Sequence, residues 1–239
     1  MVEFEELSWL RPAWDQVSAH WKSLSHGILI TGNSGIGKGH LALELSRLLL
    51  CTEPNEHQAC GQCASCQLLK NSVHPDLHVL VPETQIDNQP EPIQRHASRY
   101  FMSEKGASST RKPSRVIGVD AVRLLSDSLT TKSGRAGRKL SLIVPADRLN
   151  SNSMNALLKL LEEPAADTYI ILVSARPYRL AATIRSRCIQ LECPTPDPQV
   201  IRSWLGDRYP ETSIDVLPFA RCGFGPLQIN GIVAAGEQG

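Results

Sequence analysis

Residues 28–41 read I-L-I-T-G-N-S-G-I-G-K-G-H-L and constrain the fold of this chain more than any other stretch. A short apolar strand runs into a glycine-rich turn with the phosphate-loop spacing G-x-x-x-x-G-K, and a helix follows. In such a loop the backbone N–H groups and the positive end of the helix face a phosphate, and the lysine reaches the outer phosphates. The pattern predicts a loop shaped for ATP or ADP, and its candidate residues are Gly32, Gly35, Gly37 and Lys38.

Two positions depart from the pattern of a working ATPase. Ser or Thr normally follows the lysine and binds Mg²⁺ through its hydroxyl, but Gly39 has no side chain. The strand that should end in Asp-Glu runs on here as Val144-Pro145, and Asp147 is the nearest acid. We expect Asp147 to cap a turn or helix, and these residues by themselves leave open whether the loop belongs to an ATPase or to the relic of one.

Strands and helices alternate along most of the chain, which predicts an α/β fold with a parallel sheet covered by helices on both faces. The expected strands are 28–31, 77–81, 140–144, 168–174 and 189–193. The expected helices are 38–50, 119–129, 151–163 and 180–187.

The two ends of the chain are predicted to be helical. Apolar and aromatic residues at helical spacing in 3–25 indicate one or two amphipathic helices, broken near Pro12, that pack on the first strand. A proline-rich linker at 194–198 precedes expected helices at 199–205 and 214–221, and 231–239 is expected to fray.

Four of the seven cysteines are spaced C-x8-C-x2-C-x2-C, as Cys51, Cys60, Cys63 and Cys66. Four soft thiolates suit a tetrahedral Zn²⁺ ion, and four protein ligands leave no open catalytic position. An iron–sulfur cluster and disulfides are the alternatives. Structural zinc is the preferred interpretation, and His57 and His74 are expected to be surface residues beside a site that is already full.

Two polar stretches are expected to be loops. Residues 82–114 carry four prolines and many polar residues, so they are interpreted as a flexible insert. Residues 130–139 read T-T-K-S-G-R-A-G-R-K. This basic turn is either a nucleic-acid contact or, as we prefer, the solvated tip of a loop.

Composition excludes few partners. The formal net charge of the 239-residue chain is only +1, and 41% of its residues are hydrophobic, enough for a sizeable core. No basic start precedes an apolar run, and no apolar stretch reaches the length of a membrane span. We therefore expect a cytoplasmic protein with no membrane partner.

Several segments together resemble the bacterial clamp-loader subunits of DNA polymerase III. Besides the phosphate loop and the four cysteines, they are His74-Pro75-Asp76, Asn155–Lys159 (N-A-L-L-K), Leu161–Pro164 (L-E-E-P) and Ile184–Cys188 (I-R-S-R-C). The likeness covers about Trp14 to Leu227 without the 82–114 insert, and it implies an AAA+ fold.

Within that family, gamma/tau subunits hydrolyse ATP and delta-prime subunits largely do not. Besides Gly39 and Val144-Pro145, two further departures favour the delta-prime type. Ser174-Ala175 lacks the polar Thr that senses the γ-phosphate, and the segment 223–227 (G-F-G-P-L) lacks the arginine that motor subunits place on the lid. The resemblance implies that Arg187 is an arginine finger acting in trans on a partner's ATP. The alternative is that Arg187 pairs with a neighbouring carboxylate.

The resemblance also implies an organisation and a set of partners. Residues 1–193 would form the AAA+ domain, with the zinc module at 51–66, and 194–239 the helical lid domain. The family's helical collar domain is expected to be missing from this chain. The implied partners are the gamma/tau and delta subunits, the sliding clamp and primer–template DNA, within a DNA polymerase holoenzyme. An ATP-hydrolysing motor subunit and a zinc-dependent DNA-binding protein remain as alternatives.

Overall fold

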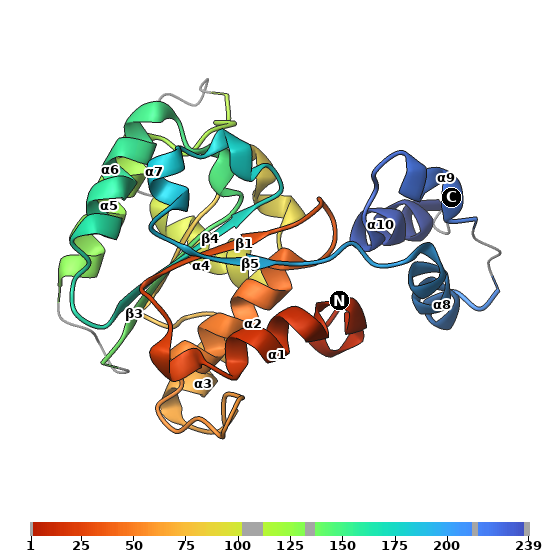
Figure 1. The fold of residues 1–239 in the computed structure, drawn as a ribbon, viewed down its shortest axis with the longest axis horizontal. Coiled ribbons are helices and arrows are strands. Elements are labelled where there is room, and N and C mark those ends of the chain that lie inside the picture. Colours follow the sequence, from red (N-terminus) through yellow and green to blue (C-terminus); the bar gives the residue numbers. More distant parts are fainter. Residues whose placement is uncertain (1, 102–111, 132–136, 212–214, 237–239) are drawn as a thin grey trace.

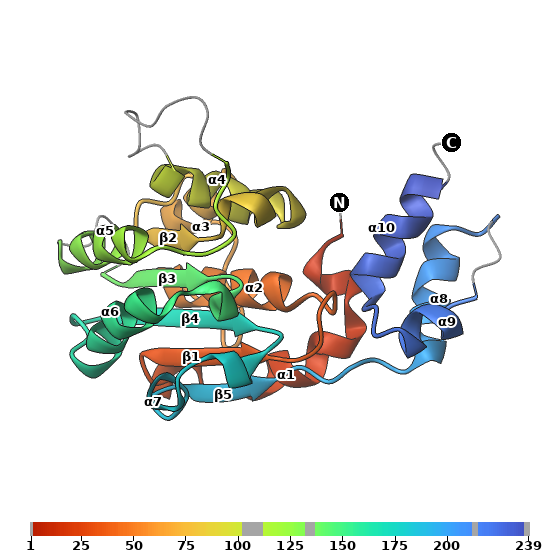
Figure 2. The ribbon, with the colours of Figure 1, turned by 90° about the horizontal axis from the view of Figure 1, so that it is seen from above.

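The computed structural model describes residues 2–101, 112–131, 137–211 and 215–236. Its centre is a five-stranded sheet in the order β2-β3-β4-β1-β5, and all neighbouring strands are parallel. Figure 2 shows this order from one edge of the sheet to the other. The strands are β1 (Gly27–Thr31), β2 (Leu77–Leu80), β3 (Lys139–Ile143), β4 (Thr168–Ser174) and β5 (Ile189–Glu192).

Helices cover both faces of the sheet. The helices of the described chain are α1 (Arg11–Ser18), α2 (Lys38–Leu50), α3 (Ala64–Lys70), α4 (Glu91–Phe101), α5 (Val119–Thr130), α6 (Ser151–Glu162), α7 (Ala182–Arg185), α8 (Pro198–Arg208), α9 (Leu217–Arg221) and α10 (Pro226–Gly236), of which the last three do not lie on the sheet (Figures 1 and 2). Short 3₁₀ helices are η1 (Phe4–Glu6), η2 (Ser8–Leu10), η3 (Trp21–Ser23), η4 (Glu83–Asn88), η6 (Ala146–Arg148) and η7 (Pro177–Arg179). Figure 1 shows α1 and α2 on one side of the sheet and α5 to α7 on the other.

Two hydrophobic cores lie between the sheet and its helices, one on each face of the sheet. Side chains of a strand alternate between the faces of a sheet, and β1 is apolar on both faces. Ile28 and Ile30 pack with α1 and α2, whereas Leu29 packs with α5 and α6. The α/β fold with a parallel sheet and helices on both faces is therefore confirmed.

The interpretation of residues 82–114 as a flexible insert was wrong over its first part. Residues 83–88 form η4 and 91–101 form α4, which packs on β2. Ile93 and Ala97, four residues apart, are fully buried in the core. Pro90 precedes α4 and Pro92 lies in its first turn, where proline needs no N–H partner. Residues 102–111 of the insert lie outside the described part of the chain.

The ends of the chain also differ from the expectation. Pro12 is the second residue of α1, so it lies in the first turn of a helix and does not break one. Residues 226–236 form α10, although 231–239 was expected to fray. Among the described residues, no helix has both the length and the apolar content needed to cross a membrane.

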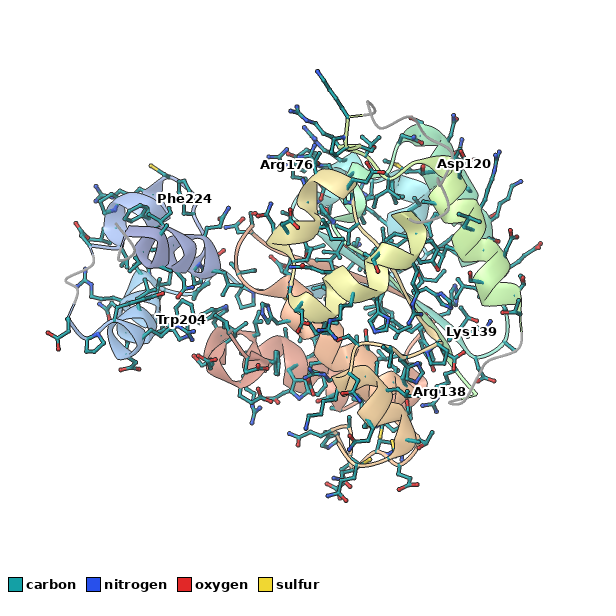
Figure 3. All side chains as sticks on the ribbon, turned by 180° about the vertical axis from the view of Figure 1, so that it is seen from behind. Asp120, Arg138, Lys139, Arg176, Trp204 and Phe224 are labelled. Atoms are coloured by element: carbon teal, nitrogen blue, oxygen red, sulfur yellow. The ribbon has the colours of Figure 1, made fainter. Side chains whose placement is uncertain are left out.

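Helices α8, α9 and α10 lie beyond the end of the sheet where β5 leaves it, as Figures 1 and 2 show. The N-terminal segment joins them to the rest of the molecule. The rings of Trp9 and Trp204 meet edge to face with centroids 5.3 Å apart. Arg208 in α8 pairs with Glu6. Figure 3 labels Trp204 on this C-terminal group of helices.

Candidate functional site

The phosphate-loop residues form one tight turn between β1 and α2. Gly32, Gly35 and Gly37 have φ angles of 138°, 75° and 94°, which residues with a side chain rarely adopt. Gly37 is the N-cap of α2, and Lys38 is the first residue of that helix. The structure thus brings all four predicted loop residues together at the positive end of α2.

The chain's own C-terminal segment lies directly against this turn. The backbone N–H of Leu227 donates a hydrogen bond to the carbonyl oxygen of Gly35 at 2.9 Å. A Cβ atom on Gly225 would lie 2.5 Å from the carbonyl carbon of Gly35, closer than any side chain allows. On the other side, a Cβ atom on Gly35 would lie 2.7 Å from the side chain of Gln228. At Gly225 the close approach to backbone atoms leaves no room for a side chain, whereas Gly35 is required mainly by its φ of 75°, since Gln228 could move away.

The N-terminal segment holds the same turn from a second direction. The indole Nε1 of Trp9 donates to the carbonyl oxygen of Ile36 at 2.8 Å. Leu7 and Leu10 lie 2.7 and 3.1 Å from the position of a Cβ on Gly37. Trp9 and Gly225 were not among the predicted site residues. The aromatic spacing of the N-terminus was visible in the sequence, but its contact with the loop was not.

The side chain of Lys38 points into the protein. It is only 7% exposed, and its Nζ donates to the carbonyl oxygen of Asn33 at 2.6 Å. Burial lowers the pKa of Lys38 from 10.5 to about 8, against the raising influence of Cys193 and Asp147. In this structure the ammonium group of Lys38 therefore donates its hydrogen bond to a backbone carbonyl of its own phosphate loop.

Position 39 is covered by the segment that was expected to be flexible. A Cβ on Gly39 would meet Ile93 at 3.5 Å and Gln89 at 3.8 Å, both ordinary contacts. A neutral amide and an apolar side chain therefore border the place where a metal-binding hydroxyl would stand.

Asp147 lies in η6, just beyond the end of β3. Ser174, at the end of the neighbouring strand β4, donates its hydroxyl to Oδ1 of Asp147 at 2.8 Å. The same hydroxyl oxygen accepts a bond from the N–H of Arg176. Asp147 thus accepts a bond from the end of the neighbouring strand, and the described residues show no bond by which it caps η6, although the sequence had led us to expect one.

The four clustered cysteines come together although they are spread over 16 residues. Cys51 follows α2, Cys63 is the N-cap of α3, and Cys66 lies inside α3. All four Sγ atoms lie within 4.8 Å of one another. The shortest separations are 3.5, 3.8 and 3.9 Å, from Cys51 to Cys60, from Cys51 to Cys63, and from Cys60 to Cys66.

These separations fit a single tetrahedral ion. Four sulfurs about 2.3 Å from a central ion would lie about 3.8 Å apart, whereas a disulfide needs about 2.0 Å. Backbone N–H groups of Cys60, Cys63 and Cys66 donate to the sulfurs of Cys51, Cys60 and Cys63. Such bonds stabilise thiolates, so the residues present could hold a metal ion.

The two nearby histidines differ from each other. His57 is exposed, as expected, and its ring bonds the carbonyl oxygen of Ser18. The expectation that His74 is a surface residue was wrong, because its side chain is completely buried. Its Nε2 lies 2.7 Å from the hydroxyl of Ser65, in the cysteine module.

In the described part of the basic turn, the side chains of Arg138 and Lys139 contact other residues of the same chain. Arg138 donates to the carbonyl oxygen of Leu49 at 3.1 Å and stacks over the ring of Trp21. Lys139 is buried and bonds the hydroxyl of Thr131 at 2.7 Å. Figure 3 labels both residues near the start of β3. Lys132 and Arg135 lie outside the described residues.

Arg187 follows α7 and lies at the opposite end of β1 from the phosphate loop. Its carbonyl oxygen is 2.9 Å from the position of a Cβ on Gly27, the first residue of β1. The five residues of β1 span about 16 Å before Gly32. The side chain is 35% exposed and pairs with Glu162 at 2.7 Å. The ion-pair alternative is thus present in the structure.

Comparisons with known proteins show which family this chain resembles. The family model described as "DNA polymerase III, delta subunit" matches residues 15–197. The DNA polymerase III subunit delta' of Pseudomonas aeruginosa is 36% identical over 87% of this chain and 55% of its own length. The subunit delta' of Escherichia coli is 35% identical over 82% of this chain and 51% of its own length.

A solved structure supports the fold. The DNA polymerase III gamma subunit-related protein of Thermotoga maritima superposes with a TM-score of 0.52 at 19% identity, over 83% of this chain and 52% of that protein. The chain has the predicted AAA+ fold and spans about half the length of these relatives. With the matched family model covering most of its residues, the chain belongs to the DNA polymerase III delta subunit family, among relatives named delta'.

Proposed function

We propose that this chain serves a clamp loader as a stator, a rigid subunit that does not hydrolyse ATP and that supplies Arg187 to the ATP of a neighbouring subunit. One observation carries the proposal. The chain's own phosphate loop is held by its own backbone contacts, while Arg187 lies about 16 Å away at the other end of β1. An arginine so placed cannot serve its own loop but can reach a site on an adjacent molecule.

The chemistry of the residues supports this division of labour. A guanidinium is always charged and spreads that charge over a planar fork of N–H donors, which suits a phosphate whose charge shifts during transfer. Lys38 is bound to Asn33, and Gly39 offers no ligand to Mg²⁺. One subunit would therefore supply positive charge, and another would hold the ATP and Mg²⁺.

The proposed partners are the gamma/tau and delta subunits of the loader, the sliding clamp and, through the assembled ring, primer–template DNA. The relatives' names place them in DNA polymerase III. For the cysteine site we propose structural Zn²⁺, held by Cys51, Cys60, Cys63 and Cys66. Four thiolates at tetrahedral spacing leave no open position for catalysis.

The decisive test is Arg187→Ala in a reconstituted loader. We expect DNA-stimulated ATP hydrolysis to fall about tenfold or more at the site that Arg187 serves, because a finger's charge is lost in the transition state. Clamp loading should fall with it while subunit assembly persists. The exposed Arg179→Ala is the matched control and should leave hydrolysis unchanged.

Two outcomes would contradict the proposal. ATP hydrolysis that is unaffected by Arg187→Ala would exclude the proposed role of Arg187 as an arginine finger. Turnover of ATP by the purified chain alone, at a rate typical of motor subunits, would show that its own phosphate loop is catalytically active, which would favour the motor-subunit alternative.

A further inference from the structure

Arg187 is held by two acceptors of its own chain. Its Nη2 pairs with Oε1 of Glu162 at 2.7 Å, and its Nη1 donates to the carbonyl oxygen of Thr183 at 3.0 Å. Both terminal nitrogens of the guanidinium therefore point back toward α6 and α7. A phosphate is best recognised by two parallel N–H groups on one edge of a guanidinium. Arg187 must therefore break its bond to Glu162 or to Thr183 before it can present such an edge to a neighbouring molecule.

We propose that Glu162 is a positioning residue for Arg187, which keeps the guanidinium folded back until the phosphates of a neighbouring subunit's nucleotide displace the carboxylate. The inference rests on the proposed function, since it concerns how the same arginine becomes available. Glu162 would then set how readily the finger is released, without touching the nucleotide itself.

The position of Glu162 in its helix supports a role in pairing with Arg187. It is the last residue of α6, and Glu163 follows it. Carboxylates are unfavourable at the negative C-terminal end of a helix, where cations are favoured. Glu162 therefore gains nothing from the helix, whereas Arg187 is attracted by both the carboxylate and the helix end.

The pair is weak enough to be exchanged. Its side chains are 35% and 42% exposed, and exposed ion pairs contribute little because water and salt screen them. A nucleotide triphosphate carries several negative charges and accepts two N–H groups at once. A neighbour's phosphates can thus take the guanidinium from a single carboxylate.

The test replaces the carboxylate in the complete loader and keeps the side chain's shape. We expect Glu162→Gln to raise kcat/KM for DNA-stimulated ATP hydrolysis about two- to fivefold, the range set by an exposed ion pair. The gain should shrink as salt is raised, because salt already weakens the wild-type pair. Glu163→Gln is the matched control: it removes one charge at the same helix end and should leave kcat/KM unchanged.

The double variant separates the two proposals. In an Arg187→Ala background, Glu162→Gln should have no effect, because Glu162 acts only through the arginine. An unchanged or lower kcat/KM for Glu162→Gln, or a gain that persists without Arg187, would overturn the role of Glu162 alone. If Arg187→Ala itself leaves hydrolysis intact, the proposed function fails instead. Thermal unfolding of Glu162→Gln should match wild type, since no buried contact is lost.

Discussion

His74 is bonded on both sides of its ring. The hydroxyl of Ser65 donates to the carbonyl oxygen of Leu50 at 2.5 Å, so it accepts from Nε2–H of His74. The Nδ1 atom accepts the backbone N–H of Asp76 at 3.1 Å. This pattern assigns the neutral Nε2–H tautomer. His74 thus connects the cysteine module to the strand that follows the His-Pro-Asp sequence.

Replacing His74 should therefore loosen that connection. We expect His74→Leu to lower the free energy of unfolding by about 2–4 kcal/mol, because it removes two buried hydrogen bonds and leaves the N–H of Asp76 without its acceptor. The exposed His57→Leu should change it by less than about 0.5 kcal/mol. Urea denaturation of both variants measures the difference. Equal effects would contradict the structural role of His74.

Lys38 makes a prediction about pH. Its pKa is lowered to about 8 in the folded chain from an ordinary 10.5, so between these values the unfolded chain binds more protons. Stability then rises with pH through this window, and the penalty of burying the charge is fully present below pH 8. We expect Lys38→Met to be more stable than wild type at pH 7.

That advantage of Lys38→Met should shrink by about 1 kcal/mol between pH 7 and pH 9. Urea denaturation at the two pH values measures it. Lys159→Met, at an exposed position, serves as the control, and its free energy of unfolding should differ from that of wild type by the same amount at pH 7 and pH 9. An advantage that grows with pH would have the wrong sign and would exclude a lowered pKa.

At the scale of elements, the cysteine module extends the helix that starts at the phosphate loop. Helix α2 begins at Lys38 and ends at Leu50, immediately before Cys51. Only one further helix, α3, belongs to the module, and its apolar contact with the main core is Leu69. A module with so few apolar contacts would depend on a bound metal ion for order, as proposed above.

We therefore expect about one equivalent of bound zinc per chain, released by a strong chelator. On release, amide hydrogen exchange should accelerate in the module while the central strand β4 stays protected. Cys60→Ser should lower the metal content, whereas the exposed Cys222→Ser should not. Unchanged exchange after complete removal of the metal would contradict a structural role.

At the scale of the whole molecule, the two ends of the chain meet at the phosphate loop. Trp9 binds the turn from the N-terminal side, and Leu227 binds it from the C-terminal side. Trp9 and Trp204 then close the connection between the two segments. These contacts connect the phosphate loop directly to helices α8 to α10.

Gly225→Ala tests that closure. The added Cβ would press on the backbone of Ser34 and Gly35, and overpacking of this kind destabilises by about 1–3 kcal/mol. Exchange of the Leu227 amide should accelerate while β4 is unaffected. Gly231→Ala meets no atom within 4 Å and should be neutral or stabilising, since alanine favours a helix. Equal behaviour of the two variants would mean that the segment does not press on the loop.

Short-range patterns determined much of this protein. The phosphate turn, the four cysteines and the alternation of strands and helices depend on residues close in sequence, whose spacing fixes their geometry. The resemblance to clamp-loader subunits used the same local motifs. The prediction for residues 83–101 was wrong because prolines are typical of loops, whereas Pro90 lies just before a buried helix and Pro92 lies in its first turn.

Only the tertiary structure decided what those motifs contact. Glu6 and Arg208 are 202 positions apart, and the contact between Leu227 and Gly35 is of the same kind. The periodicity of apolar residues in the sequence cannot predict such a contact, because the contact depends on how whole helices and strands pack against one another. The sequence therefore determined that the chain has a phosphate loop and an Ile184–Cys188 segment containing Arg187, while packing decided that Trp9 and Leu227 bind the loop and that Glu162 pairs with Arg187.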